Sequence, residues 1–306
     1  MKVILFGASK GGENYIANHP DLEIVAFVDN DASKHGTMFM GFPIIAPTTI
    51  ALHSFDSIVI TSQWVDQIYR QLTEELKIPA SKIISPNKQA VKASLPFEDS
   101  STLAFAQTLL RTLNQFCNSR NISMCLDSGT LLGAIRDNAL IAWDDDIDLA
   151  IDKENFEKLH ALLPELFEVI SSRFNVNWEI VVISVDGIDS CFNIEFSNSS
   201  ETNYVLFDVS IQRRESRDGY SELLSSGGLF FAPAKHFERY EPISFLDDIF
   251  YAPFEADGFL TFMYGEWQTP QKTTHITEYK NRRASMPMRK GGIKVTKRTL
   301  SHEGVN

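Results

Sequence analysis

The sequence is poor in cysteine, in long apolar runs, and in basic residues relative to acidic ones. Its three cysteines, Cys117, Cys125 and Cys191, include no close pair, so neither a disulfide framework nor a zinc site is indicated. No apolar run approaches the roughly 18 residues of a membrane span, and the N-terminal run is too short for a signal peptide. The net charge of −12 argues against a nucleic-acid-binding surface, because such surfaces are basic. We therefore expect a cytoplasmic protein, with peripheral attachment to the inner face of the membrane left open.

Length and charge distribution suggest how the chain is divided. With 306 residues, of which 43% are hydrophobic and 22% charged, the chain is typical of a globular protein with two domains. Residues 271–306 hold nine Lys or Arg and two Glu, a net charge of +7, against −19 for the residues before them. We predict a first domain at 1–90, a linker at 91–101, a second domain at 102–270 and a basic tail at 271–306. The tail is either solvated surface or a clamp over an anionic substrate or membrane.

The first domain has the pattern of an α/β nucleotide-binding fold. An apolar strand at 3–6 runs into the glycine-rich turn FGASKGG, a short amphipathic helix follows, and a second strand ends in Asp29. This order predicts a Rossmann-like domain. Ser9 stands where the middle glycine of GxGxxG belongs, which disfavours a nicotinamide site and favours a structural turn. The stretches FGASKGG, VDND and GFPIIAP also resemble the small nucleotide-sugar-binding domains that precede some bacterial sugar-modifying transferases.

The second domain is predicted to begin with a helix and to become rich in β-strands later. Apolar residues recur at helical spacing over 102–119, and a strand is expected at 122–126. Gly129 and Thr130 then open a second helix. The free N–H groups and positive dipole of a helix N-terminus suit an anion, so these two residues are the expected phosphate site.

Five aspartates crowd into residues 144–152, where a strand is predicted at 141–151. Side chains alternate along a strand, so Asp146 and Asp148 share one face, roughly 6–7 Å apart, and can bind one or two hard cations, Mg²⁺ or Mn²⁺. Asp208 stands alone in the apolar strand 203–211, where a carboxylate is costly to bury without a cation or hydrogen bonds. It is the expected third ligand, with a place on an exposed face as the alternative. Asp144 and Asp145 are given supporting roles, because three consecutive acids in a strand cannot all face the same way.

These residues resemble a known family. A Gly-Thr turn, an Asp-x-Asp strand and a third acid on a later strand are typical of the nucleotidyltransferase superfold. Within it, GTLLGAIRDNALIAWDDDIDLAI at 129–151 resembles the signature of the LicD family of phosphocholine transferases, to which fukutin and fukutin-related protein are also similar. The Tyr-Gly-x-Trp-x-x-Pro motif of the family is present at 264–270. Two departures stand out: Asp137 replaces the usual His after Arg136, and Ala142 replaces the Pro before the Trp.

The resemblance implies an α+β nucleotidyltransferase-fold domain with a metal-dependent transferase activity. The expected reaction moves a phospho-alcohol group, phosphocholine-like, from a CDP-activated donor to a hydroxyl of a cell-surface glycan or its precursor, as in lipopolysaccharide or capsule biosynthesis. Asp146, Asp148 and Asp208 would bind the metal and activate the acceptor, and Arg136 would contact a phosphate. The alternatives are NMP transfer by the same fold, a non-catalytic nucleotide-sugar-binding protein, and a nicotinamide-dependent oxidoreductase.

Two more residues complete the candidate binding set. Lys235 would hold a donor or acceptor phosphate, or be solvated surface. Trp267 would line an aromatic cage for a quaternary ammonium group, although aromatics at such spacing more often lie in the core. For the first domain the sequence leaves three roles open: binding a nucleotide sugar, positioning the acceptor, or forming the interface of a homo-oligomer.

Overall fold

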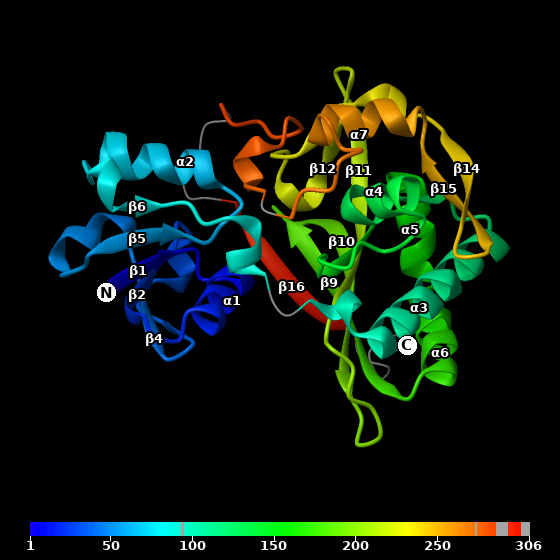
Figure 1. Ribbon diagram of the computed structural model, residues 1–306, viewed down its shortest axis with the longest axis horizontal. Helices are drawn as coiled ribbons and strands as arrows, with labels where there is room; N and C mark the ends of the chain where they lie inside the picture. The colour runs from blue at the N-terminus through cyan, green and yellow to red at the C-terminus, as the bar shows by residue number, and fades with distance from the viewer. Residues whose placement is uncertain (93–94, 273, 286–292, 301–306) are drawn as a thin grey trace. The chain divides into compact units, whose positions relative to one another are not determined.

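The chain forms two compact units. The computed structural model in Figure 1 describes residues 1–92, 95–272, 274–285 and 293–300. Unit 1 consists of Met1–Ala93 with Gln271–Lys294, and unit 2 of Ser94–Pro270 with Val295–Asn306. Residues 93–94 of the expected linker, and residues 273, 286–292 and 301–306 of the expected tail, lie outside the described residues.

Unit 1 is built on a six-stranded sheet in the order β3-β4-β2-β1-β5-β6. β3 is antiparallel to β4, and the other neighbouring strands are parallel. The strands are β1 (Lys2–Phe6), β2 (Glu23–Val28), β3 (Met38–Phe39), β4 (Phe42–Ile45), β5 (Ser57–Ile60) and β6 (Ile83–Ile84). The helices are α1 (Lys10–Asn18), α2 (Val65–Arg70) with a π-helical continuation (Gln71–Glu75), and short 3₁₀ segments at Ala32–Lys34, Pro47–Leu52, Ala80–Lys82, Lys88–Val91 and Ile276–Glu278.

The apolar run of β1 is buried on both faces of this sheet. Val3 and Leu5 pack into one cluster with residues of α1, whereas Ile4 and Phe6 pack into another with residues of α2. Successive strand residues point to opposite faces, so a continuous apolar run is what a doubly covered parallel strand requires. The two helices therefore cover opposite faces of the sheet. The α/β character predicted for the first domain is confirmed, and its Rossmann-like assignment stays a prediction.

Unit 2 contains a larger, mixed sheet in the order β13-β12-β11-β10-β9-β16, in which β8 pairs with β11 and with β7. The strands are β7 (Met124–Leu126), β8 (Asp146–Asp152), β9 (Val176–Val185), β10 (Ile188–Asn198), β11 (Asp208–Arg217), β12 (Tyr220–Leu223), β13 (Phe231–Pro233) and β16 (Val295–Leu300), with a separate hairpin of β14 (Tyr240–Phe245) and β15 (Asp248–Pro253). The helices are α3 (Ser100–Ser119), α4 (Ser128–Arg136), α5 (Lys153–Ala161), α6 (Leu163–Arg173) and α7 (Ala256–Tyr264), with 3₁₀ segments at Pro96–Glu98, Leu224–Ser226 and Ala234–His236.

Unit 2 has a core that joins its helices to the sheet. Leu109, Leu113, Phe192 and Ile211 are fully buried in it, and the apolar stripe of α3 supplies much of one side. Pro164 lies in the first turn of α6, where its missing N–H costs no hydrogen bond, so it starts a helix as well as separating it from α5. Among the described residues, no helix combines the length and apolar character needed to cross a bilayer.

The structure corrects three boundaries predicted from the sequence. The strand predicted at 141–151 begins only at Asp146, because the backbone N–H of Asp144 donates to the carbonyl of Ile141 at 2.9 Å and closes a turn. The linker is shorter than 91–101, since Phe97 is buried in the core of unit 2 and α3 begins at Ser100. The predicted basic tail at 271–306 does not form one segment, because its residues are divided between the two units.

The described part of the expected tail is divided between the two units. Residues 274–285 pack on unit 1, where buried Arg282 forms an ion pair with Asp66 at 2.5 Å. Residues 295–300 form β16, which is antiparallel to β9 and adds an edge strand to the sheet of unit 2. The side chain of Arg298 donates two hydrogen bonds to Asp189, at 2.8 and 2.7 Å. Basic residues in this region are therefore used in part to attach the segment to the rest of the chain.

Candidate functional site

Three predicted carboxylates come together at the start of two neighbouring strands of unit 2. β8 and β11 are parallel, with Asp146 opposite Asp208 and Asp148 opposite Ser210. Residues paired across a parallel ladder face the same side, as do residues two apart on one strand, so Asp146, Asp148 and Asp208 share a face. Neighbouring strands lie about 4.8 Å apart, and residues two apart on a strand roughly 6.5 Å apart. The register thus places acidic residues up to 62 positions apart in the chain on one face of the sheet.

Asp144 and Asp145 also belong to this carboxylate group. Ligand oxygens of Asp144, Asp145 and Asp146 all lie within 4.8 Å of one another. The supporting role given to Asp144 and Asp145 assumed that all three acids lie in a strand. Because β8 begins at Asp146, the two preceding residues are in a turn, where the alternation of a strand does not apply. The convergence of these three consecutive carboxylates therefore could not be predicted from the alternation of side chains along a strand.

Gly129 and Thr130 hold helix α4 against these carboxylates. A Cβ atom on Gly129 would lie 2.0 Å from Oδ2 of Asp144, so only glycine leaves room for that carboxylate in its present position. The hydroxyl of Thr130 is buried and accepts a hydrogen bond from the backbone N–H of Asp148 at 2.9 Å. The side chain of Thr130 therefore fixes α4 to β8, and the predicted phosphate contact is left to backbone N–H groups of this turn.

Asp127 also holds the turn at the start of α4 in place. Its carboxylate accepts from the N–H of Ser128 at 2.8 Å and forms a buried ion pair with Arg214 of β11 at 2.8 Å. The two side chains are only 1% and 3% exposed. The backbone N–H of Asp127 also donates to the carbonyl of Asp148 at 3.1 Å. The pair thus connects the start of α4 to both strands that carry the site.

Gln212 is a further residue of the site that was not predicted from the sequence. Its Nε2 donates to Oδ1 of Asp148 at 2.7 Å, and its Oε1 accepts from Ser225 at 2.6 Å. The alternation along β11 contained the necessary signal, because Asp208, Ser210 and Gln212 are the polar residues between buried Val and Ile. Gln212 therefore restricts the orientation of Asp148.

Arg136 is engaged differently from the phosphate contact predicted for it. Its guanidinium donates three hydrogen bonds to the carboxylate of the neighbouring Asp137, at 2.6–3.0 Å. It also lies 5.8 Å from the ring centroid of Trp143, and its side chain is only 7% exposed. The residue that departs from the family pattern, Asp137, therefore neutralises the expected phosphate ligand.

Lys235 and Trp267 lie in different surroundings. Lys235 is about half exposed and pairs with Glu255. Trp267 belongs to the core of unit 2, and its indole N–H donates to the hydroxyl of Thr261 at 3.2 Å. The core interpretation of Trp267, which was weighed against the aromatic cage, describes its position in the structure.

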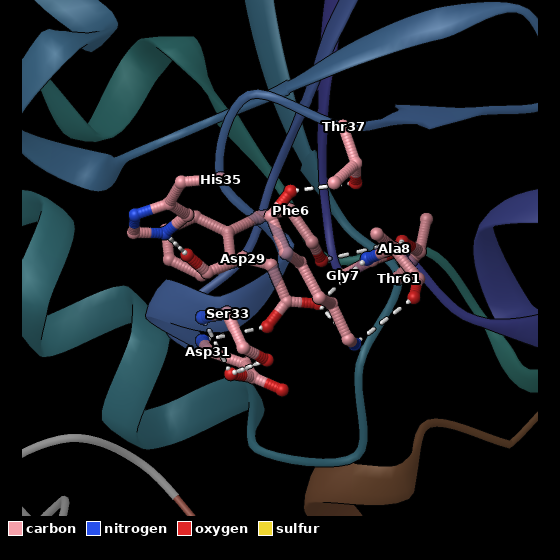
Figure 2. A network of polar contacts seen from close by, with 10 residues as sticks. Phe6, Gly7, Ala8, Asp29, Asp31, Ser33, His35, Thr37 and Thr61 are labelled. Atoms are coloured by element: carbon pink, nitrogen blue, oxygen red, sulfur yellow. Dashed lines mark hydrogen bonds and ion pairs between the residues drawn. The ribbon is translucent and has the colours of Figure 1, made fainter.

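The glycine-rich turn of unit 1 is closed by its own chain. Figure 2 shows the Asp29 carboxylate directed at this turn, where Oδ2 accepts from the N–H of Ala8 at 3.2 Å. The same oxygen pairs with Lys34 at 2.8 Å, and Lys34 also donates to the carbonyl of Ala8 at 3.3 Å. The acid that follows β2 is thus neutralised locally. A nucleotide sugar at this turn stays a prediction.

Packing within unit 1 accounts for two of the glycines of this turn. A Cβ on Gly12 would lie 2.6 Å from the ring of Phe27, and one on Gly11 would lie 2.5 Å from the carbonyl oxygen of Thr61. Both contacts are too short for any larger residue without a shift of the chain. The structural explanation of these glycines therefore requires no ligand.

Comparison with known proteins identifies the region that carries the carboxylates. Residues 121–254 match the family model described as LicD/FKTN/FKRP, nucleotidyltransferase domain. This part of the chain is similar to the LicD family. Residues 1–84 match a second model, described as C2185-like, N-terminal. The LicD resemblance seen in the sequence is confirmed, and the motif at 264–270 lies beyond the matched residues.

Two individual relatives match with low sequence identity or over a short segment. The chain is 26% identical over 159 residues to the uncharacterized protein RP689 of Rickettsia prowazekii, which covers 52% of this chain and 53% of that protein. It is 38% identical over 50 residues to lipopolysaccharide cholinephosphotransferase LicD of Haemophilus influenzae, covering 16% of this chain and 19% of that one. The chain thus spans about half the length of the first relative and less of the second.

Among solved structures, UDP-D-quinovosamine 4-dehydrogenase from Vibrio fischeri matches with 24% identity. The match covers 25% of this chain and 72% of that one, and its TM-score of 0.21 is too low to support any argument about fold. The LicD assignment therefore rests on the family model and on the LicD relative.

Proposed function

We propose that the LicD domain is a metal-dependent transferase that moves a phospho-alcohol group from a CDP-activated donor to a hydroxyl of a cell-surface glycan or its precursor. One observation carries the proposal: the register that sets Asp208 opposite Asp146, with Asp148 on the same face. The name of the LicD relative, a lipopolysaccharide cholinephosphotransferase, supports this choice of reaction. The donor alcohol is left to experiment.

The chemistry of the side chains fits a hard divalent cation. The site presents carboxylate oxygens, of which those of Asp144, Asp145 and Asp146 converge within 4.8 Å. Mg²⁺ and Mn²⁺ prefer oxygen ligands of this kind. When bound, the cation would neutralise the charge of the donor pyrophosphate and act as a Lewis acid. Asp146, Asp148 and Asp208 are the residues that we propose hold it.

The protein itself supplies orientation and a base. Gln212 and the backbone contact to Thr130 fix Asp148, and the ion pair of Asp127 with Arg214 fixes the start of α4. Contacts that orient the proposed metal ligands matter because catalytic groups must be held within a fraction of an ångström of their working positions.

In the proposed reaction, Asp208 takes the proton of the acceptor hydroxyl. The acceptor oxygen forms a bond to the phosphorus that bears the alcohol, and the bond from that phosphorus to the bridging oxygen of the pyrophosphate breaks. CMP leaves with the electron pair of that bond.

The proposal is tested first without an acceptor. Titration of the full chain with Mn²⁺, followed by electron paramagnetic resonance, should show binding that Asp146→Asn and Asp208→Asn each weaken at least tenfold, since each removes a charged ligand. Asp218→Asn is the matched control, because Asp218 follows β11 directly but its side chain is 87% exposed. Mn²⁺ binding that is absent, or that is equal in all four proteins, would contradict the proposed metal site.

Product analysis then identifies the reaction. With CDP-alcohols and glycan acceptors, the proposal predicts free CMP and an acceptor that gains the alcohol phosphate. Release of pyrophosphate from CTP with CMP attached to the acceptor would instead establish nucleotidyl transfer and overturn the proposed donor chemistry.

A further inference from the structure

A surface cavity of unit 2 gathers charged groups from three separate elements. Its volume is about 280 Å³. Helix α3 supplies residues at positions i, i+3 and i+7, which form one stripe of the helix, while the end of α6 and the β14–β15 hairpin supply the rest. The lining residues are Thr108, Arg111, Gln115, Arg173, Asp247 and Asp248. Helices α3 and α6 lie side by side (Figure 1).

The charged groups of this cavity do not neutralise one another. Within the described part of the chain, neither Arg111 nor Arg173 forms an ion pair, although two carboxylates line the same cavity. A contrast occurs nearby, where Arg120 after α3 pairs with Glu165 of α6 at 2.9 Å. Oppositely charged side chains near these helices can therefore form an ion pair. The arginines and carboxylates that line the cavity do not.

Neutral partners hold two of the charged groups in place. Nη1 of Arg173 donates to the hydroxyl of buried Thr112 at 2.9 Å. The carboxylate of Asp248 accepts from the side chain of Gln115 at 3.0 Å and from the N–H of Ile249 at 2.8 Å. These contacts orient the charges and leave other guanidinium nitrogens available to a ligand.

We infer that this cavity binds a small phosphate monoester whose other end carries hydroxyl or ammonium groups. Two guanidinium groups suit a phosphate, because their planar N–H donors match its oxygens. The carboxylates of Asp247 and Asp248 accept from hydroxyl or ammonium donors at the other end of the ligand. The volume lies just below the range of roughly 300–1,000 Å³ usual for ligand pockets, so the ligand is small.

The inference is independent of the proposed transferase site. None of Asp146, Asp148 and Asp208 lines the cavity, which is built from α3, α6 and the β14–β15 hairpin. A loss of binding here would leave the Mn²⁺ titration unchanged, and a failure of the metal site would leave this cavity intact.

Calorimetric titration of the full chain with inorganic phosphate, glycerol 3-phosphate, phosphoethanolamine and glycerol tests the inference. We expect at least one ester to bind more tightly than inorganic phosphate, and glycerol not to bind. Arg111→Gln and Arg173→Gln should each raise the dissociation constant at least tenfold, as expected for the loss of a charge-assisted hydrogen bond. Arg217→Gln, at a side chain 82% exposed on β11, is the matched control and should bind like the wild type.

Carboxylate variants separate the two possible donor groups. Asp247→Asn and Asp248→Asn should weaken the esters but leave inorganic phosphate unaffected. A larger loss for phosphoethanolamine indicates an ammonium group, which needs the negative charge, and a larger or equal loss for glycerol 3-phosphate indicates hydroxyls. Absence of saturable binding at about 10 mM ester, or dissociation constants unchanged in both arginine variants, would overturn the inference. Because all four side chains line the surface cavity, circular dichroism of each variant should match the wild type.

Discussion

The buried ion pair between Asp127 and Arg214 should be essential to the stability of unit 2 and to the geometry of the LicD site. Its atoms are 2.8 Å apart, and the guanidinium carbon of Arg214 lies 4.1 Å from the ring centroid of Phe237. Asp127→Asn removes the charge but keeps an oxygen to cap Ser128. Arg214→Met removes the other charge and keeps an unbranched side chain beside the aromatic ring.

The expected loss of stability is large, because neither group can regain water. With side chains 1% and 3% exposed, removal of one partner leaves the other as an uncompensated buried charge. Such a change costs about 3–5 kcal/mol. In a unit of this size each kcal/mol lowers Tm by about 2–4 °C, so each single variant should melt about 6–20 °C below the wild type. The double variant Asp127→Asn/Arg214→Met should recover most of the loss, since it leaves no isolated charge.

Differential scanning calorimetry of the full chain measures the Tm, and the Mn²⁺ titration measures the effect on the site. Because the ion pair joins the start of α4 to β11, and the backbone N–H of Asp127 donates to the carbonyl of Asp148, a shift of Asp127 in the single variants should weaken Mn²⁺ binding at temperatures where they remain folded. Arg217→Met provides the control, since Arg217 and Asp218 form an ion pair whose side chains are 82% and 87% exposed. A shift below about 2 °C for Asp127→Asn, or a double variant that loses the sum of both single losses, would refute the reasoning.

Two further predictions concern an edge strand and two helices. The Arg298 guanidinium holds the pKa of Asp189 at about 2, well below its usual range, so this contribution to stability is present above about pH 4 and is lost as the pH falls through 2. Arg298→Gln should raise the pKa of Asp189 toward 4 in an NMR titration, and an unchanged pKa would show that β16 is held by other contacts. Gly133→Ala should destabilise the protein by about 1–3 kcal/mol in thermal melts, because its Cβ would lie 2.4 Å from the carbonyl oxygen of Ala139. Gly258→Ala in α7, where the new Cβ makes ordinary contacts from 3.5 Å, should instead stabilise by about 0.5–1 kcal/mol, and the same sign for both would contradict the argument.

Much of the framework was predictable from local pattern. The apolar stripe of α3 and the buried run of β1 follow from helical spacing and from burial on both faces of a parallel sheet, respectively. The same alternation puts Asp146 and Asp148 on one face of β8. The alternation of side chains along one strand does not reveal which residue of a neighbouring strand lies opposite. Asp208 and Asp146 are 62 residues apart in the chain, and only the register of the folded sheet defines their pairing.

The convergence of Asp144 with Asp145 and Asp146 was missed because the strand was expected to begin too early. Its start at Asp146 follows from a turn hydrogen bond to Ile141, a local contact that propensity does not reveal. Gly129 contained a clue, since a glycine beside a predicted helix start often marks a close approach of another group. In the structure that group is the Asp144 carboxylate.

Asp137 shows how a single departure from a family pattern can redirect a neighbouring residue. In the sequence it stood out as a departure from the family pattern, while Arg136 kept its expected role as a phosphate ligand. In the structure the Asp137 carboxylate accepts three hydrogen bonds from Nε and Nη2 of that guanidinium, so a phosphate at this edge of Arg136 would have to displace an internal partner of the same charge sign. The competition favours Asp137, which is adjacent in the chain and needs no loss of translational freedom to bind. We therefore predict that any phosphate contacts at this helix come mainly from its other end, where Gly129 lies beside the Asp144 carboxylate.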